Sequence, residues 1–355
     1  SFQHYDTYKD TGSSGTDRIE ALGGDVDIGL KGFDSNSGIE VIDATAASGQ
    51  VRLLGSDSAD VLDFRSTSLL GSNIVVDGGW GKDTIYGNAA DNIITGAFDA
   101  DTMDGGNGSD TYLVRGNLAL GWSSFQHYDT YADTGTGSTD IDTIKALGAG
   151  DVDVGLKGFG TSSGIEVIDA TGASGQVRLL GSDSADVLDF RTTTFKGSNI
   201  VLAGGWGADT IYGNGDDNTI IGGYDADTMD GGNGSDIYKV TGNLALGWSS
   251  FNHYDTYSDT GTGTTDIDTI KALGDGDVDI GLKGFGPSSG IEVIDASGAL
   301  GKVRLLGSDS ADVLDFRSTT FIGNNISLVG GWGADTIYGN GTDNTIIGAG
   351  DADTM

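Results

Sequence analysis

Aspartate is the residue type most able to do chemistry in this sequence. The 355 residues include 53 acidic and 18 basic ones, and only Glu20, Glu40, Glu166 and Glu292 are glutamates. A surface that merely kept a protein in solution would mix both acids. Asp is the acid that sits in turns and bonds to nearby backbone, and its short carboxylate is a ligand for hard cations held in turns. The composition therefore indicates cation binding by turns.

The aspartates follow a nine-residue period. From Gly78 the chain reads GGWGKDTIY, GNAADNIIT, GAFDADTMD and GGNGSDTYL, and similar runs begin at Gly204 and Gly330. The sixth place of most units is acidic, whereas the second unit of each run has Asn there with Asp before it, and each DADTM segment adds a further Asp. The candidate metal ligands are therefore Asp60, Asp83, Asp91, Asn92, Asp99, Asp101, Asp110, Asp186, Asp209, Asp217, Asn218, Asp225, Asp227, Asp236, Asp312, Asp335, Asp343, Asn344, Asp351 and Asp353.

Carboxylates at this spacing should stack, because alternate units turn on the same side of a coil. We expect Asp83 to lie over Asp101. Without a cation, each close pair of carboxylates repels by at least about 1 kcal/mol even in a water-like dielectric. Carboxylate and carbonyl oxygens suit Ca²⁺ or Mg²⁺, and Ca²⁺ accepts about six to eight oxygens from an irregular loop, whereas Mg²⁺ usually keeps several waters. Several bound Ca²⁺ ions are thus the expected cofactor.

A family resemblance supports this expectation. The units GGWGKDTIY, GGNGSDTYL and GGWGADTIY resemble the GGxGxDxUx nonapeptide of the RTX (repeats-in-toxin, haemolysin-type calcium-binding) family. The resemblance implies a right-handed parallel β-roll with Ca²⁺ between successive turns, held by sixth-place carboxylates and by carbonyls of the Gly-rich half. Asn at the sixth place departs from the motif, so either those sites are weaker or the preceding Asp supplies the charge. The pairs that the resemblance implies are Asp83 with Asp101, Asp209 with Asp227, Asp335 with Asp353, Asp110 with Asn92, and Asp236 with Asn218.

The nine-residue unit also predicts the elements that position these carboxylates. It is too short for a repeat containing a helix and fits one turn and one short strand. Its Gly, Asn and Asp supply turn conformations, and its apolar eighth place, such as Ile85, points inward. Two units close one coil, and stacked coils pair parallel strands about 4.8 Å apart. Hairpins of an antiparallel barrel would alternate over about five or six residues and do not explain the fixed register. With the handedness that the resemblance implies, we predict an all-β fold, a right-handed parallel β-roll or β-solenoid.

A longer repeat organises the chain. SFQHYDTY at Ser1 returns at Ser124 and, as SFNHYDTY, at Ser250, which are spacings of 123 and 126 residues. We predict the domains as 1–123, 124–249 and a truncated 250–355, with nonapeptides at 78–113, 204–239 and 330–355, and expect the sequence to be a piece of a longer protein. Between these runs, segments such as GIEVIDA and GQVRLL alternate apolar and polar residues, which predicts wider, metal-poor coils. The aromatic block GWSSFQHYDTY is expected to cover a hydrophobic edge, with sugar binding or subunit contact as the alternatives.

Several classes of function are excluded or disfavoured. A formal charge of −35 excludes nucleic acid as a natural partner, because a polyanion needs Lys and Arg. The chain has no Cys for disulfides or for a thiolate metal site, and it has no apolar run of about 18 residues that could span a bilayer. Catalysis by paired carboxylates would need one acid of raised pKa in a cleft. The periodic acids do not suit such a site, so we predict that the chain is not an enzyme.

These observations predict a calcium-binding structural repeat segment of a large secreted bacterial cell-surface protein, such as an adhesin, a surface layer or an extracellular filament. It would fold on export into calcium-rich medium, because repulsion among so many Asp should keep the ion-free chain disordered. Its partners would be Ca²⁺ and further copies of the same protein or repeats. The resemblance implies export by a type I system. The alternative is the calcium-binding C-terminal region of a secreted RTX enzyme (protease, lipase or alginate epimerase) whose catalytic domain lies elsewhere. A weaker alternative is recognition of ice by Thr rows or of glycans by the aromatic block.

Overall fold

The computed structural model describes residues 4–12, 14–115, 128–135, 139–241, 254–261 and 266–355. Every strand pairing recorded among them is parallel. The helical elements of this part of the chain are three short 3₁₀ turns, η1 (Ser35–Ser37), η2 (Thr161–Ser163) and η3 (Pro287–Ser289). None is long and apolar enough to cross a membrane. The predicted all-β parallel β-roll is confirmed.

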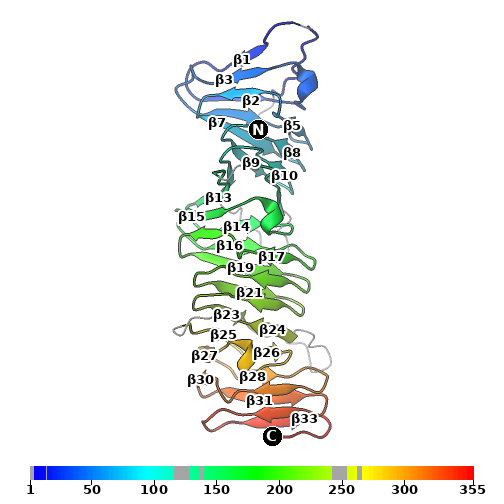
Figure 1. The fold of residues 1–355 in the computed structure, drawn as a ribbon, viewed down its shortest axis with the longest axis vertical. Helices are drawn as coiled ribbons and strands as arrows, with labels where there is room; N and C mark the ends of the chain where they lie inside the picture. Colours follow the sequence, from blue (N-terminus) through cyan, green and yellow to red (C-terminus); the bar gives the residue numbers. More distant parts are fainter. Residues whose placement is uncertain (1–3, 13, 116–127, 136–138, 242–253, 262–265) are drawn as a thin grey trace. The chain divides into compact units, whose positions relative to one another are not determined.

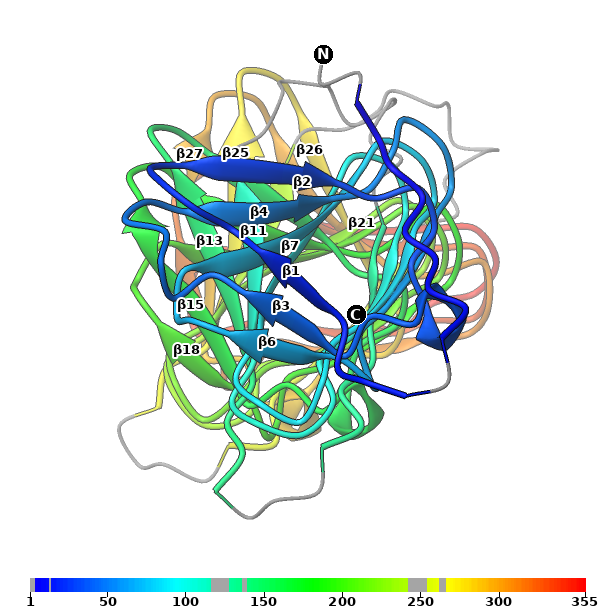
Figure 2. The same ribbon diagram turned by 90° about the horizontal axis from the view of Figure 1, so that it is seen from above.

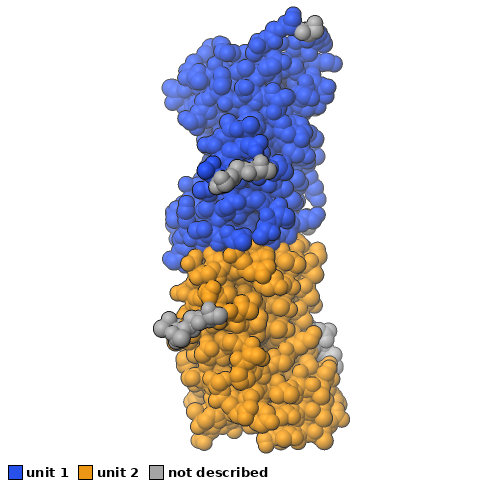
Figure 3. All heavy atoms as spheres, in the orientation of Figure 1, with its two compact units in different colours: residues 1–179, 192–199 blue, residues 180–191, 200–355 orange. Residues whose placement is uncertain are grey.

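The chain divides into two compact units (Figure 3). Unit 1 comprises Ser1–Leu179 and Thr192–Asn199, and unit 2 comprises Leu180–Arg191 and Ile200–Met355. The boundary between the units falls inside the second sequence copy. The division into three sequence copies stays a prediction about domains, and each unit is described separately below.

Unit 1 stacks its strands in parallel sheets that form different walls of the coils, with β2, β4 and β7 on one wall and β1, β3 and β6 on another (Figures 1 and 2). The largest sheet has the order β18-β15-β13-β11-β9-β7-β4-β2, a second has the order β12-β10-β8-β5, and a third has the order β1-β3-β6. The strands of this unit are β1 (Arg18–Glu20), β2 (Val26–Gly29), β3 (Val41–Asp43), β4 (Val51–Leu54), β5 (Val61–Asp63), β6 (Ser68–Leu70), β7 (Ile74–Gly79), β8 (Thr84–Tyr86), β9 (Ile93–Ala97), β10 (Thr102–Asp104), β11 (Thr111–Arg115), β12 (Thr130–Tyr131), β13 (Thr143–Gly148), β14 (Val152–Gly155), β15 (Val167–Ala173) and β18 (Thr194–Lys196), and β16 (Val177–Leu180) ends one residue into unit 2.

Unit 2 repeats the arrangement. One wall has the order β19-β21-β23-β25-β27-β30, another has the order β17-β20-β22-β24-β26-β28-β31-β33, and β29 pairs with β32. Its strands are β17 (Val187–Asp189), β19 (Ile200–Gly205), β20 (Thr210–Tyr212), β21 (Thr219–Gly223), β22 (Thr228–Asp230), β23 (Ile237–Thr241), β24 (Tyr254–Ser258), β25 (Thr269–Gly274), β26 (Val278–Leu282), β27 (Val293–Ala299), β28 (Val303–Leu306), β29 (Val313–Asp315), β30 (Thr320–Ile322), β31 (Ile326–Gly331), β32 (Thr336–Tyr338) and β33 (Ile346–Ala349).

The coil length changes along unit 1. Within the nonapeptide run, β8 pairs with β10 so that Thr84 lies beside Thr102, and contacts between these adjacent coils join residues 18 apart. Beyond the run the coils are wider, because the corresponding contacts join residues 28 and 32 apart. Two nonapeptides therefore close one coil, as predicted, and the roll continues through the longer segments.

The core is a column of apolar side chains inside the coils. The eighth-place residues Ile85, Ile94, Met103 and Tyr112 are all buried. Burial of a side chain of this size contributes about 1.5–3 kcal/mol relative to exposure. The wide coils continue the column with Val, Ile, Leu and Phe, and Phe33 stacks on Phe64 with ring centroids 5.0 Å apart. The buried eighth-place side chains fix the register of the strands. They therefore also position the turns that carry the carboxylates.

The aromatic block predicted to cover an edge lies partly outside the described residues, which resume at Tyr128 in its first full occurrence and at Tyr254 in the next. The described ends of both occurrences form strands. In unit 1, Tyr131 of β12 is buried and its ring meets Tyr112 edge to face. This end of the block therefore belongs to the core of the roll.

Candidate calcium centres

The sixth-place carboxylates form ladders along the turns. Asp60 N donates to Asp83 Oδ1, Asp83 N to Asp101 Oδ1, and Asp101 N to Asp129 Oδ1, at 2.8–3.0 Å. Each coil thus donates a backbone hydrogen bond to one carboxylate oxygen of the next coil. The predicted stacking of Asp83 with Asp101 is present in the structure. Unit 2 repeats this ladder through Asp186, Asp209, Asp227 and Asp255, and again through Asp312, Asp335 and Asp353.

A second ladder runs along the other turns of the same coils. Asn92 N donates to Asp110 Oδ1 at 2.6 Å, Asp110 N donates to Asp142 Oδ1 at 2.8 Å, and Asp142 N donates to Glu166 Oε2 at 2.8 Å. The predicted neighbours Asn92 and Asp110 are therefore adjacent. The ladder also continues past the nonapeptides into residues that were not among the predicted ligands. Unit 2 has the same order in Asn218, Asp236, Asp268 and Glu292.

The second oxygen of many ladder carboxylates has no hydrogen-bond partner although it is buried. Asp110 and Asp236 are 0% exposed, and Asp83 is 2% exposed. An ionised carboxylate oxygen without a partner is costly to bury, and a divalent cation would remove that cost. The oxygens concerned are Oδ2 of Asp83, Asp101, Asp110, Asp209, Asp227, Asp236 and Asp335.

Glycine leaves space directly beside these oxygens. A Cβ added to Gly96 would lie 2.2 Å from Asp101 Oδ2, and one added to Gly78 would lie 2.6 Å from Asp83 Oδ2 and 2.8 Å from the carbonyl oxygen of Gly96. Carboxylate and carbonyl oxygens thus converge where any other residue would place carbon. This oxygen-rich donor set is the kind that Ca²⁺ prefers, so the residues present fit the ion.

The turns also need glycine for backbone reasons. Gly79 and Gly81 have φ of 96° and 107°, in the left-handed region that glycine adopts most readily. Asp99 is one of the few other residues there, with φ of 71°, and its Oδ2 accepts a hydrogen bond from Gly81 N at 3.1 Å. The second and fourth places of these units thus have a conformational requirement, and the sixth place carries the candidate ligand.

Burial makes these carboxylates hold protons when no ion is present. It raises the pKa of Asp83 to about 8, that of Asp101 to about 7 and that of Asp110 to about 8, each from 3.8. The backbone hydrogen bond that each accepts opposes the increase in pKa, and neighbouring carboxylates add to it. A bound cation would reverse the effect by favouring the ionised form. In unit 2 the pKa is likewise raised for Asp209, Asp227, Asp236 and Asp335.

Asn at the sixth place is satisfied within the protein. Asn92 Oδ1 accepts from Asn88 N at 2.7 Å, and Asn92 Nδ2 donates to Asn88 Oδ1 at 3.0 Å. The preceding Asp91 is exposed and accepts from Ser109 N at 2.9 Å. Both interpretations that the sequence left open, a weaker site or one in which Asp91 supplies the charge, stay predictions. Asn218 makes both corresponding bonds with Asn214, and Asn344 Nδ2 donates to Asn340 Oδ1.

The first acid of each series is also held by protein donors. Asp60 Oδ2 accepts from the backbone N and the hydroxyl of Ser56, both at 2.6 Å. Asp186 and Asp312 accept the same pair of bonds from Ser182 and Ser308. Asp99, Asp225 and Asp351 each accept from a glycine N one coil away. The assignment of each acid as a ligand stays a prediction, and the unpartnered oxygens named above are its best candidates.

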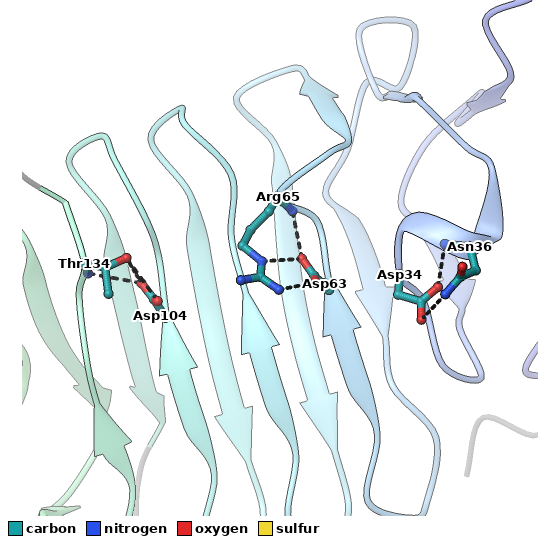
Figure 4. A network of polar contacts seen from close by, with 6 residues as sticks. All are labelled: Asp34, Asn36, Asp63, Arg65, Asp104 and Thr134. Atoms are coloured by element: carbon teal, nitrogen blue, oxygen red, sulfur yellow. Dashed lines mark hydrogen bonds and ion pairs between the residues drawn. The ribbon is translucent and has the colours of Figure 1, made fainter.

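Other aspartates contrast with the ladders. Figure 4 shows Asp63 paired with Arg65, Asp104 accepting from Thr134, and Asp34 accepting from Asn36. In the wide coils, Arg178 forms a two-bond ion pair with Asp153 of the adjacent coil. In contrast, Oδ2 of ladder carboxylates such as Asp83 and Asp110 is buried without a hydrogen-bond partner.

The structure adds a group that the sequence analysis missed. Asp110, Asp133 and Asp142 can each place one oxygen within 4.8 Å of the others, and so can Asp236, Asp259 and Asp268. Two members of each group lie in coils that we expected to be metal-poor. The sequence does contain a signal for Asp142. It is followed by Thr143 and Ile144, the same order of Asp, Thr and a large apolar residue that Asp110 begins in the nonapeptide run.

The fold and these turns define a β-roll protein with a calcium-binding repeat region. Residues 77–112, 203–238 and 328–355 match the family model described as RTX calcium-binding nonapeptide repeat (4 copies). These three segments are thus RTX nonapeptide repeats, as the sequence resemblance predicted. A search of curated proteins gave no match.

Proposed function

We propose that this chain is a calcium-dependent structural repeat segment of a large secreted bacterial protein, at the cell surface or in an extracellular filament, adhesin or surface layer. The observation that carries the proposal is the row of buried carboxylate oxygens without hydrogen-bond partners, repeated in each nonapeptide run. Calcium ions placed between coils would neutralise them and cross-link the coils. Further copies of the chain or of its repeats are its expected partners.

Repetition supports a structural role over a catalytic one. The ladder of Asp83, Asp101 and Asp129 recurs as Asp209, Asp227 and Asp255 with the same hydrogen bonds. A stack in which every coil contributes similar sites grows in length with copy number. The alternative, in which the chain is the calcium-binding region of a secreted enzyme, shares the repeats and differs in what lies elsewhere in the protein.

The first test follows the far-ultraviolet circular dichroism band of β-structure during calcium titration of chain treated with a chelator. Coupled folding and binding predicts little β-structure in chelator and a cooperative gain with added Ca²⁺. A chain with full β-structure in chelator would contradict the proposal.

The same titration separates the ladder from other carboxylates. The triple variant Asp83→Asn, Asp209→Asn and Asp335→Asn keeps the hydrogen-bond acceptor but removes charge, so its titration midpoint should move to higher Ca²⁺. The matched control is Asp25→Asn, Asp151→Asn and Asp277→Asn, because these exposed acids also accept a backbone hydrogen bond from an adjacent coil. The control should titrate like the original chain.

Electron microscopy of the native assembly then distinguishes a filament or lattice from an enzyme tail.

A further inference from the structure

Three carboxylates meet where the nonapeptide run gives way to a wide coil. Asp110 ends the run, and Asp133 and Asp142 belong to the following sequence copy. One oxygen from each lies within 4.8 Å of the others, and Asp110 and Asp142 are also joined by the backbone hydrogen bond from Asp110 N to Asp142 Oδ1 at 2.8 Å. All three belong to unit 1. The same three places are filled by Asp236, Asp259 and Asp268 in unit 2.

The cluster contains a fully buried oxygen without a partner. Asp110 is 0% exposed, and its Oδ2 has no hydrogen-bond partner, whereas its Oδ1 accepts from Asn92 N. Asp133 is held in place, since Oδ1 accepts from Gly135 N at 2.7 Å and Oδ2 accepts from the Tyr112 hydroxyl at 2.9 Å. The Asp110 carboxylate therefore lies beside two other carboxylates, and its Oδ2 has no hydrogen-bond donor to balance its charge.

In unit 2 the cluster has more oxygens without partners. The Tyr238 hydroxyl donates to Ser258 O at 2.7 Å, and Asp259 Oδ2 accepts from Gly261 N at 2.8 Å. Asp259 Oδ1 is then buried without a partner, as is Asp236 Oδ2, and Asp236 is 0% exposed. The unpartnered oxygen therefore does not depend on one particular tyrosine contact.

A space bounded by oxygens adjoins the cluster in each unit. A Cβ added to Gly135 would lie 2.6 Å from Gly106 O and 2.9 Å from Asp133 Oδ1. A Cβ added to Gly261 would lie 2.4 Å from Gly232 O and 2.7 Å from Asp259 Oδ2. Backbone and side-chain oxygens of two different coils thus converge beside each cluster, as in the nonapeptide turns.

We propose that the group of Asp110, Asp133 and Asp142 holds one further divalent cation, and that the group of Asp236, Asp259 and Asp268 holds another, where the second ladder leaves the nonapeptide repeats. Three carboxylates and nearby carbonyls select a hard ion, and the choice of Ca²⁺ among hard ions rests on the proposed function. Because Asp110 belongs to one sequence copy and Asp133 and Asp142 to the next, the ion ties consecutive copies together. The wide coils would then be ion-linked at the point where they leave the nonapeptide run.

Bound calcium per chain tests this inference. Equilibrium dialysis of the 355-residue chain at about 1 mM free Ca²⁺, near the range of extracellular calcium sites, should show two fewer ions for Asp142→Asn with Asp268→Asn than for the original chain. Asn keeps the acceptor for Asp110 N and Asp236 N, so the hydrogen bonds of the ladder remain. The control, Asp151→Asn with Asp277→Asn, makes the same charge change at exposed acids and should lose no ion. An unchanged count in the folded Asp142 and Asp268 variant would overturn the inference.

A crystal structure of the original chain with Ca²⁺ decides the matter if the variant does not fold. Anomalous difference density between the three carboxylates, about 2.3–2.6 Å from their oxygens, is the expected result. Density at the nonapeptide ladders but not at the clusters would overturn this inference alone. Absence of bound calcium from both places would also overturn the proposed function.

Discussion

At the residue scale, one oxygen of each ladder carboxylate is structural and the other is available. Asp83 Oδ1 accepts from Asp60 N at 2.8 Å, while Asp83 Oδ2 is buried without a hydrogen-bond partner. The first oxygen positions the carboxylate, and the second creates the requirement for a cation. The neutral Asn92 side chain instead bonds within its own turn, because its Oδ1 accepts from Asn88 N and its Nδ2 donates to Asn88 Oδ1.

The raised pKa values predict that calcium binding releases protons. In folded molecules without an ion, the carboxyl groups of Asp83 and Asp110 have a pKa of about 8, so in this folded fraction they are largely protonated near neutral pH and must ionise to bind the ion. Calcium affinity should therefore rise with pH between about 6 and 8. Isothermal titration calorimetry at about pH 7, in two buffers of different ionisation enthalpy, should give different heats that correspond to net proton release. Equal heats would show that the carboxylates are already ionised.

Calcium affinity is expected to rise with pH, whereas the stability of the folded chain without calcium is expected to fall as pH rises. The folded ion-free chain binds more protons than the unfolded chain between the unfolded pKa of 3.8 and the folded pKa of about 7 to 8. Any ion-free fold should therefore lose stability as pH rises through that window. In chelator, β-structure should be greater at about pH 5 than at about pH 8, as measured by circular dichroism.

At the element scale, the turn glycines keep space beside the ligand oxygens. Gly96 is not in the left-handed region, so Gly96→Ala tests space alone: its Cβ would lie 2.2 Å from Asp101 Oδ2. We expect calcium affinity to fall at least tenfold, or about 1.4 kcal/mol, as measured by titration calorimetry. Gly150→Ala is the matched control, because no atom lies within 4 Å of its Cβ, and it should leave affinity unchanged. Equal affinities for the two variants would contradict the assigned role of the Gly96 turn.

In a wide coil of unit 1, an arginine pairs with a buried aspartate of the adjacent coil. Arg178 pairs with Asp153, whose side chain is 2% exposed. Arg178→Met should destabilise the calcium-loaded chain by about 1–3 kcal/mol, because a buried carboxylate loses its charged donor. Arg65→Met is the control, since Arg65 is largely exposed beside Asp63, and should cost less than about 1 kcal/mol. Urea unfolding in calcium measures both changes, and equal costs would contradict the distinction.

The parts of the fold that the sequence predicts are those with a fixed period. Ile85 and Met103 could be placed in register, and Asp83 beside Asp101, because 18 residues close each coil. The period is lost after Asp110, where the next ladder contact is 32 residues away. Loops of unequal length leave the register of the wide coils undetermined by local pattern, so Asp133 and the pairing of Arg178 with Asp153 could not be predicted.

At the scale of the whole molecule, long-range repulsion among the acidic residues opposes folding, and local binding of ions to buried carboxylates permits it. The formal charge of −35 acts between distant residues and is screened by salt, with a Debye length of about 3 Å at 1 M. Screening does not supply a ligand to a buried Asp110 Oδ2. Monovalent salt and calcium should therefore act differently on the same chain.

Small-angle X-ray scattering should reveal this difference. An unfolded chain of 355 residues has a radius of gyration of about 68 Å, and we expect a value near this in chelator. Calcium at about 1 mM should give a folded scattering profile. In contrast, 1 M NaCl should contract the chain without producing β-structure, because salt screens only the repulsion between distant charges. Mg²⁺ at the concentration of Ca²⁺ should be less effective, since it keeps its waters and demands octahedral geometry. Complete folding in NaCl alone would show that net charge, rather than the ladder oxygens, controls the transition.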